Sequence, residues 1–168
     1  HIIVGGGIAN TFLKAAGLDV GKSLVEDSML DIAKELIEEG KIVLPRNVTT
    51  SKSFEGRDIK EKSVNEITED EMILDLSLEE KTFSLINDAK TILWNGPVGV
   101  FENDIFAEGT RCLSKAISKS KAFSLAGGGE TLSAINKYIN PDDVSYCSTG
   151  WGAFLEFMEG KTLPSIKA

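Results

Sequence analysis

The feature that most restricts the fold of this chain is a regular alternation of short apolar segments with helical stretches. Four of the apolar segments end in glycine-rich or small-residue turns, at residues 5–7, 95–99, 127–129 and 149–152. Strands that alternate with helices through short turns are typical of a parallel sheet covered by helices. We therefore expect an α/β fold, namely a three-layer α/β/α, Rossmann-like domain with a mainly parallel sheet.

The expected elements follow from apolar periodicity and from turn residues. Ser77 and Glu80 have the spacing of a capping box and predict a helix start at Ser77. The segment 47–71 is polar and predicts loop with one or two short strands, and we interpret its acidic residues Glu66, Glu69, Asp70 and Glu71 as a solvated loop. Strands are expected at 2–4, 42–44, 48–54, 72–76, 91–94, 122–126 and 144–147, and helices at 8–16, 26–39, from 77, at 104–119 and after 127 and 148.

Composition excludes several classes of protein. The chain has 168 residues with a formal net charge of −8, and it contains no basic run, so we expect no nucleic-acid partner. Its apolar runs are too short for a transmembrane helix, and no signal peptide is visible. Two cysteines, Cys112 and Cys147, make no disulfide framework and fit a reducing compartment, so we expect a cytoplasmic protein with inert thiols.

The four turns also suggest a binding function. In a parallel sheet they lie at one edge, where open α/β sheets bind ligands. Glycine permits close approach of a ligand to the backbone, and the helices that follow offer free N–H groups to an anion. Each turn taken alone is equally compatible with tight strand-to-helix geometry and no ligand. Together they indicate a phosphate or nucleotide site, although none has the G-x-G-x-x-G dinucleotide fingerprint.

Residues 16–23, Ala-Gly-Leu-Asp-Val-Gly-Lys-Ser, fit a relaxed P-loop pattern. A P-loop must leave a strand and enter a helix, whereas here a helix precedes the motif. We therefore interpret Gly17 as the C-cap of that helix.

Residues 93–102, Leu-Trp-Asn-Gly-Pro-Val-Gly-Val-Phe-Glu, closely resemble the signature of the phosphoglycerate kinase family. Residues 4–12, 126–131 and 148–164 agree with that family in the same order. The resemblance covers the whole chain and is to the C-terminal, nucleotide-binding domain of a two-domain glycolytic enzyme. It implies that residues 1–168 form a single nucleotide-binding domain. The chain begins with His1 at a strand, so we expect a fragment that lacks the domain's first strand segment and the N-terminal substrate domain.

The resemblance implies where a nucleotide would bind. Gly6 and Gly7 would pack near the adenine, with Phe54 and Leu74 closing the base pocket. Asn95 and Pro97 would lie along the nucleotide, and Glu102 would hold the ribose hydroxyls.

It also implies where the phosphates would lie. Glu130 stands where the family has an acidic residue that serves Mg²⁺ with the nucleotide, and Thr131 would touch the phosphates. The N–H groups of Gly129 and Gly152 would face the transferring phosphoryl group. Trp151 stands where the family has glycine, and we expect its indole to turn outward and be partly exposed, leaving the N–H of Gly152 aimed at the site.

The implied function is reversible phosphoryl transfer between 1,3-bisphosphoglycerate and Mg-ADP, which gives 3-phosphoglycerate and ATP. We expect a monomer that binds ADP or ATP with Mg²⁺ and is inactive alone, since the phosphoglycerate would bind only with the missing N-terminal domain. The alternative is a non-catalytic nucleotide-binding module that uses the same sheet edge. A Rossmann-type oxidoreductase is disfavoured because the dinucleotide fingerprint is absent.

Overall fold

The strands of the computed structural model, which describes residues 1–164, form three small sheets. Two of the sheets are parallel, as expected from the alternation of strands and helices, and the third is antiparallel. The parallel pair is β1 (Ile2–Ile3) with β2 (Ile42–Val43), the antiparallel sheet has the order β4 (Lys60–Ser63), β3 (Asn47–Ser51), β5 (Met72–Ser77), and the second parallel sheet has the order β6 (Thr91–Asn95), β7 (Phe123–Gly127), β8 (Tyr146–Ser148).

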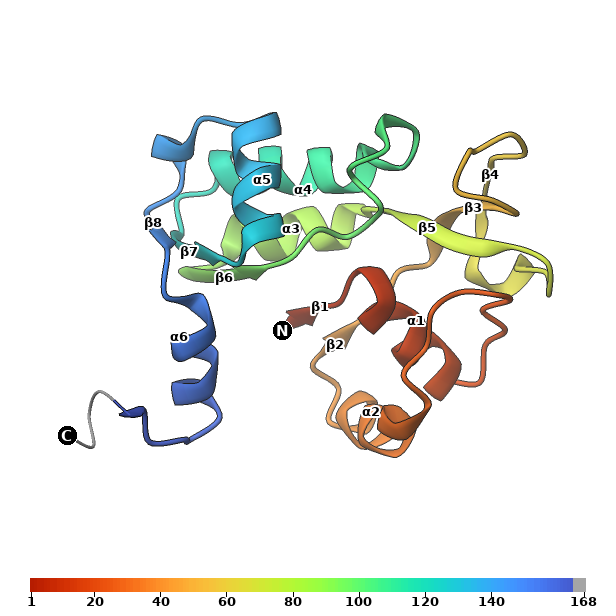
Figure 1. The fold of residues 1–168 in the computed structure, drawn as a ribbon, viewed down its shortest axis with the longest axis horizontal. Coiled ribbons are helices and arrows are strands. Elements are labelled where there is room, and N and C mark those ends of the chain that lie inside the picture. The colour runs from red at the N-terminus through yellow and green to blue at the C-terminus, as the bar shows by residue number, and fades with distance from the viewer. Residues whose placement is uncertain (165–168) are drawn as a thin grey trace.

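Helices cover these sheets in two groups, as Figure 1 shows. The helices within residues 80–138 lie on the same side of the β6–β7–β8 sheet, and the helices within residues 6–38 lie beside the short β1–β2 sheet. The sixth helix follows β8 and runs away from the sheet. In chain order the α-helices are α1 (Gly6–Ala15), α2 (Leu30–Glu38), α3 (Glu80–Asp88), α4 (Glu108–Lys119), α5 (Gly129–Tyr138) and α6 (Trp151–Met158). The predicted α/β class is confirmed, with helices flanking mainly parallel strands.

The antiparallel sheet departs from a purely parallel arrangement. β3, β4 and β5 follow one another through loops that contain no crossover helix. Parallel strands need a crossover of a dozen or more residues, so these closely spaced strands pair antiparallel. The polar segment 47–71, predicted to be loop with one or two short strands, supplies the two strands β3 and β4.

The predicted capping box at Ser77 is wrong. The N-cap of α3 is Glu79, and Ser77 is the last residue of β5. The Ser77 hydroxyl donates instead to Glu61 on β4, at 2.8 Å. The capping-box spacing is present in the sequence, but pairing of Ser77 with β3 keeps its backbone in the strand.

The loop with the relaxed P-loop pattern does not bridge a strand and a helix. The C-cap of α1 is Ala16, one residue before the predicted Gly17, and Gly17 follows it with φ of +86° and an N–H that donates to the carbonyl of Lys14. The helix thus ends at this glycine, although the C-cap position itself is wrong by one residue. Further along the loop, the N–H of Lys22 donates to the carbonyl of Glu71, which packs the loop against the start of β5. The motif is therefore a helix end followed by a packed loop.

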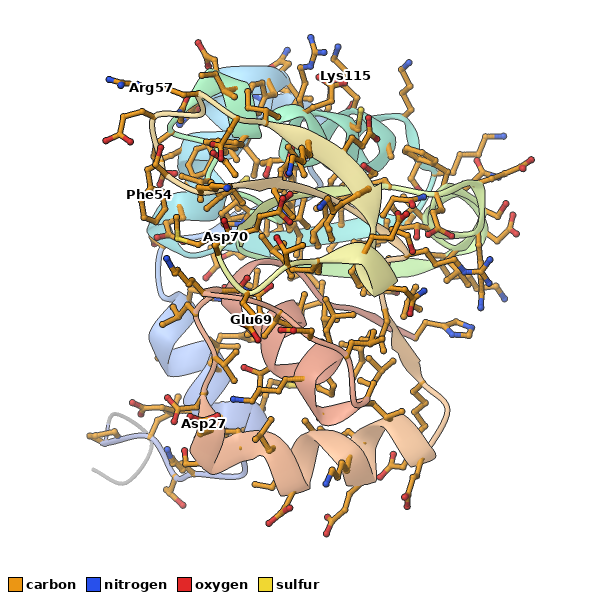
Figure 2. All side chains as sticks on the ribbon, turned by 90° about the vertical axis from the view of Figure 1, so that its right-hand side faces the viewer. Asp27, Phe54, Arg57, Glu69, Asp70 and Lys115 are labelled. Carbon is orange, nitrogen blue, oxygen red and sulfur yellow. The ribbon has the colours of Figure 1, made fainter. Side chains whose placement is uncertain are left out.

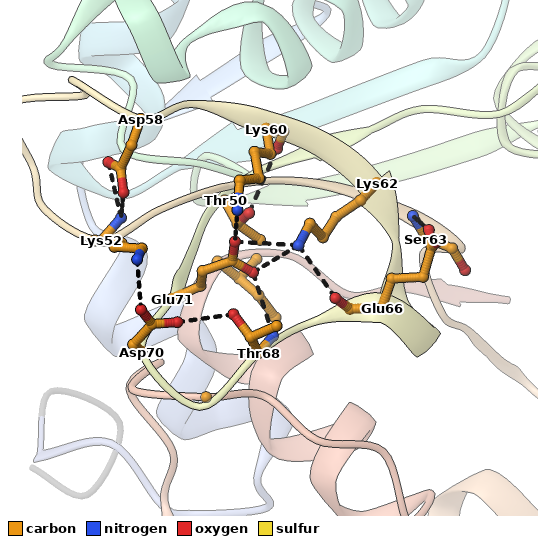
Figure 3. A network of polar contacts seen from close by, with 12 residues as sticks. Thr50, Lys52, Asp58, Lys60, Lys62, Ser63, Glu66, Thr68, Asp70 and Glu71 are labelled. Atoms are coloured by element: carbon orange, nitrogen blue, oxygen red, sulfur yellow. Dashed lines mark hydrogen bonds and ion pairs between the residues drawn. The ribbon is translucent and has the colours of Figure 1, made fainter.

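The expectation of a solvated acidic loop fails at Glu71, whose side chain is only 1% exposed. Its carboxylate accepts hydrogen bonds from Lys60 and Lys62 and from the backbone N–H of Thr68, and Figure 3 shows this network. Burial alone would raise the pKa of Glu71, but the hydrogen bonds from the two lysines and Thr68 outweigh it and hold the pKa at about 2. The two lysines come from β4, so the network ties that strand to the start of β5.

The hydrophobic core lies where the helices meet the sheets. Phe106, Leu13 and Ile135 are the largest fully buried apolar side chains, and Trp94 is buried on β6. The opposite face of the β6–β7–β8 sheet exposes Leu93, Phe123 and Tyr146. Within residues 1–164, every helix is too short or too polar to cross a membrane.

Candidate functional site

A groove of about 570 Å³ runs along the ends of the strands that carry the first two glycine-rich turns. It is bounded by the turn before α1, by β5 and by the segment that follows β6. Eight of the residues that the sequence resemblance assigned to a nucleotide line it together, namely Gly6, Gly7, Phe54, Leu74, Asn95, Pro97, Glu102 and Glu130. Residues from five separate parts of the chain are thus brought to one cavity.

Close backbone packing joins the two turns at the floor of the groove. The N–H of Gly6 donates to the carbonyl of Val98 at 3.1 Å, and a Cβ on Gly5 would overlap Val98. Only glycine fits at position 5 without displacing the second turn. The N–H of Val98 in turn donates to the hydroxyl of Thr110, so α4 fixes the second turn from behind.

Exposed apolar side chains border the groove. Leu24 is 79% exposed and Phe54 is 58% exposed, and Ile8, which also lines the groove, is exposed as well. Figure 2 shows Phe54 on the outer margin of the molecule, on the same side as Arg57. Large apolar side chains that line a cavity without filling it suit the flat, weakly polar surface of an aromatic base.

The loop that carries Leu24 is held by Asn10 of α1. Asn10 is buried, and its Nδ2 donates to the carbonyl of Leu24 at 3.2 Å. Within residues 1–164 its buried Oδ1 has no hydrogen-bond partner. Asn10 also lines the groove, although the sequence analysis did not single it out.

Asp75 is the ionisable group most deeply buried in the groove wall. Its side chain interrupts the apolar run of β5 and accepts backbone N–H groups from Leu76 and Gly109, at 2.9 and 2.8 Å. Burial raises the pKa of Asp75 to about 6, against the opposing effect of these two hydrogen bonds. Sequence reasoning missed this residue, and the signal available was a single carboxylate inside an otherwise apolar strand.

Two side chains hold the turn that follows β6. The indole Nε1 of Trp94 donates to the carbonyl of Gly96 at 2.9 Å. The N–H of Gly96 donates to the hydroxyl of Thr131, which is fully buried at the start of α5, at 2.7 Å. Thr131 therefore connects the turn at 95–99 with the turn at 127–129.

The expectation that the Trp151 side chain turns outward is wrong. Its indole is 6% exposed, lies against Gly127 and stacks on Phe154 with ring centroids 5.0 Å apart. Its Nε1 donates to Oδ1 of Asn95 at 2.8 Å. The physical reason is that burial beside glycine removes apolar surface from water while the ring N–H keeps a hydrogen-bond partner.

The remaining predicted residues differ in whether they line the groove. Glu102 and Glu130 line it and are exposed. Gly129 is the first residue of α5 and Gly152 the second of α6, and both are exposed. Neither of these glycines contributes to the groove lining, nor does Thr131.

The side chains of residues 1–164 fit a magnesium ion only if one carboxylate binds it together with substrate phosphates and water. Residues 1–164 contain no group of three or more His, Cys, Asp and Glu side chains arranged for a metal ion. Mg²⁺ is commonly bound through one or two carboxylates together with substrate phosphates and water. Glu130, exposed in the first turn of α5 and lining the groove, fits that single-carboxylate role.

The sequence and the fold of this chain are similar to those of known proteins. The sequence model of the family described as phosphoglycerate kinase matches residues 1–161. A phosphoglycerate kinase of Psychrobacter sp. (strain PRwf-1) is 52% identical over 181 aligned positions, which cover 100% of this chain and 45% of the relative.

Two solved structures are also similar. Phosphoglycerate kinase from Coxiella burnetii has a TM-score of 0.90 and 46% identity, over 98% of this chain and 44% of that one. Phosphoglycerate kinase from Pyrococcus horikoshii OT3 has a TM-score of 0.79 and 31% identity, over 98% of this chain and 44% of that one. This chain spans less than half the length of these relatives, and it belongs to the phosphoglycerate kinase family.

Proposed function

We propose that this member of the phosphoglycerate kinase family supplies the nucleotide-binding half of an enzyme that transfers a phosphoryl group between 1,3-bisphosphoglycerate and Mg-ADP. The products in that direction are 3-phosphoglycerate and ATP. The observation that carries the proposal is the meeting of Gly6, Phe54, Asn95 and Glu102 in one groove, although they are far apart in the sequence.

Each part of the groove has a chemical role in this proposal. The adenine packs on Gly6 and Gly7 between the side chains of Phe54 and Leu74. Asn95 and Pro97 lie along the nucleotide, and Glu102 accepts hydrogen bonds from the ribose hydroxyls. An exposed carboxylate suits that role, because ribose hydroxyls are donors and a carboxylate is purely an acceptor.

The phosphates extend towards the N-termini of α5 and α6. Thr131 and the N–H groups of Gly129 and Gly152 lie on that side, and Glu130 would bind the Mg²⁺ that accompanies the nucleotide. The ion would neutralise charge on the phosphate oxygens. The protein contributes positioning and N–H donors, which is most of what phosphoryl transfer needs from a protein.

Transfer also needs the second substrate, held close in a cleft from which water is excluded. We assign residues 1–168 to one nucleotide-binding domain that acts with a separate N-terminal substrate domain in the cytoplasm. The chain alone is then a monomer that binds Mg-ADP and does not turn over.

Titration calorimetry of the folded chain with Mg-ADP tests the binding proposal. We expect saturable binding, and absence of heat at millimolar ADP would overturn the nucleotide site. A coupled ATP-forming assay then compares the chain with the longer protein. Activity only in the longer protein supports the kinase assignment, whereas nucleotide binding without activity in the longer protein supports a non-catalytic module.

A further inference from the structure

The first residue of α6 is hydrogen-bonded to the groove across 56 positions of sequence. Trp151 Nε1 donates to Asn95 Oδ1 at 2.8 Å. The indole is held on three sides, since one face lies against Gly127, Phe154 stacks on the ring, and Asn95 accepts the N–H. A ring that is 6% exposed and so enclosed has little freedom to leave this position.

This contact determines which way the Asn95 amide faces. An indole N–H is only a donor, so the atom it contacts must be the carbonyl oxygen of the Asn95 side chain. The amide NH₂ is then the end of that side chain available to a ligand. Asn95 is exposed and lines the groove, so its amide donors are offered to whatever binds there.

The available donors match the chemistry of a nucleotide. Phosphate oxygens and the ribose ring oxygen are acceptors, and they pair with N–H groups. With glycine at position 151, no indole would hold Oδ1, and the amide could rotate to offer either end. Trp151 therefore selects a donor-presenting rotamer of Asn95.

We propose that Trp151 is a positioning residue for nucleotide binding, which acts through Asn95 and does not touch the ligand. This role rests on the proposed nucleotide site. It couples the N-terminal end of α6 to the groove, because Trp151 is both the first residue of that helix and the partner of Asn95.

A double-mutant cycle with Mg-ADP affinity as the readout tests this role. Trp151→Phe keeps a smaller aromatic ring at this position and removes the N–H donor, and we expect about threefold to tenfold weaker binding, the range of one lost hydrogen bond. In an Asn95→Ala background the same change should have no further effect. Phe157→Ala, an exposed position on the same helix, is the matched control and should bind as the wild type.

A spectroscopic measurement supports the cycle and does not depend on the Trp151 variant folding. The chain has two tryptophans, so its NMR spectrum has two indole N–H signals. Asn95→Ala should shift the signal of Trp151, whose acceptor is removed, much more than that of Trp94, whose acceptor is the backbone carbonyl of Gly96. Mg-ADP should shift the Trp151 signal in the wild type and not in Asn95→Ala.

The outcomes separate this role from the proposed function. If the wild type binds Mg-ADP and Trp151→Phe binds equally well, Trp151 has no positioning role and the nucleotide site stands. Equal weakening by Trp151→Phe with and without Asn95 shows a general structural effect and also overturns the role. A folded wild type that binds no nucleotide overturns both proposals.

Discussion

The carboxylate of Asp75 accepts the backbone N–H of Gly109, with Oδ2 and N 2.8 Å apart, and so joins β5 to the first turn of α4. A Cβ on Gly99 would overlap the same carboxylate, so Asp75 also underlies the segment that follows β6. The negative charge lies at the positive end of the helix dipole, which partly offsets its burial. One buried side chain thus connects the groove wall to the helix behind it.

The pKa of Asp75 predicts a pH-dependent difference between the wild type and Asp75→Asn. Burial raises this pKa to about 6 from 3.8, so between these values the folded state binds more protons than the unfolded state. The contribution of the Asp75 carboxyl to the free energy of unfolding is therefore present at low pH and is lost as pH rises. The unfolding free energy of the wild type should fall by roughly 3 kcal/mol relative to Asp75→Asn between about pH 4 and 7.

Urea unfolding of both proteins across that pH range measures the difference. The two share every other titrating group, including Glu71, so those contributions cancel. A difference that stays constant with pH would show that the Asp75 carboxyl titrates normally in the folded protein.

Glu71 predicts the opposite dependence. Its pKa is lowered to about 2 from 4.5, so its stabilising contribution is complete above the higher value and is lost as pH falls towards the lower one. At neutral pH, Glu71→Gln should lower the unfolding free energy by about 3 kcal/mol, because it leaves the nearly buried ammonium of Lys62 without its counter-ion. Chemical denaturation of both proteins measures this loss.

Glu69→Gln is the matched control for Glu71→Gln. Glu69 is an exposed carboxylate two positions away, and we expect its loss to change stability by less than about 0.5 kcal/mol. Equal effects at the two positions would mean that the Glu71 ion pairs contribute no more than a surface charge.

The features that could be predicted from the sequence are those that local residues determine. The strand-to-helix turns at 5–7 and 95–99 are encoded by glycine and proline at fixed positions, and they meet at the groove as expected. The end of α1 beside Gly17 is equally local, because the φ of +86° at Gly17 is one that few other residues adopt.

The features that could not be predicted depend on partners distant in the sequence. Glu71 looks like one member of a charged loop until β4 places Lys60 and Lys62 beside it. The direction of the Trp151 side chain depends on the absence of a side chain at Gly127, which no local pattern around position 151 reveals. Asp75 could be noticed in its strand, but its partner Gly109 could not.

Phe54→Ala should weaken Mg-ADP binding without lowering stability. The side chain is 58% exposed and lines the groove, so its removal leaves little cavity in the folded protein. Stacking of a base on an aromatic ring predicts a loss of about tenfold in affinity. Calorimetry measures the affinity and thermal melting the stability, with Ile59→Ala, an exposed position outside the groove lining, as the control. Unchanged affinity in Phe54→Ala would place the base elsewhere.

Glu102→Ala tests the ribose end of the groove. A carboxylate that accepts two ribose hydroxyls should contribute about tenfold to a hundredfold in affinity, while an exposed side chain contributes little to folding. We expect weaker Mg-ADP binding with an unchanged melting temperature, and no change in binding for Glu38→Ala on the surface of α2. A lower melting temperature with normal affinity would identify Glu102 as a structural residue.

Gly127→Ala should displace the Trp151 indole from its position. Gly127 has no positive φ, so its backbone accepts alanine, but the added Cβ would overlap the ring carbons of Trp151. Overpacking of this kind should lower the unfolding free energy by about 1–3 kcal/mol and shift tryptophan emission to longer wavelength as the indole enters water.

The same substitution in a Trp151→Gly background isolates the cause. With the indole absent, the alanine methyl meets no ring, and the cost of Gly127→Ala should fall close to zero. Urea unfolding of the wild type, both single variants and the double variant completes the cycle. An equal cost in the two backgrounds would mean that Gly127 is needed for its backbone alone, and that the indole does not lie against it in solution.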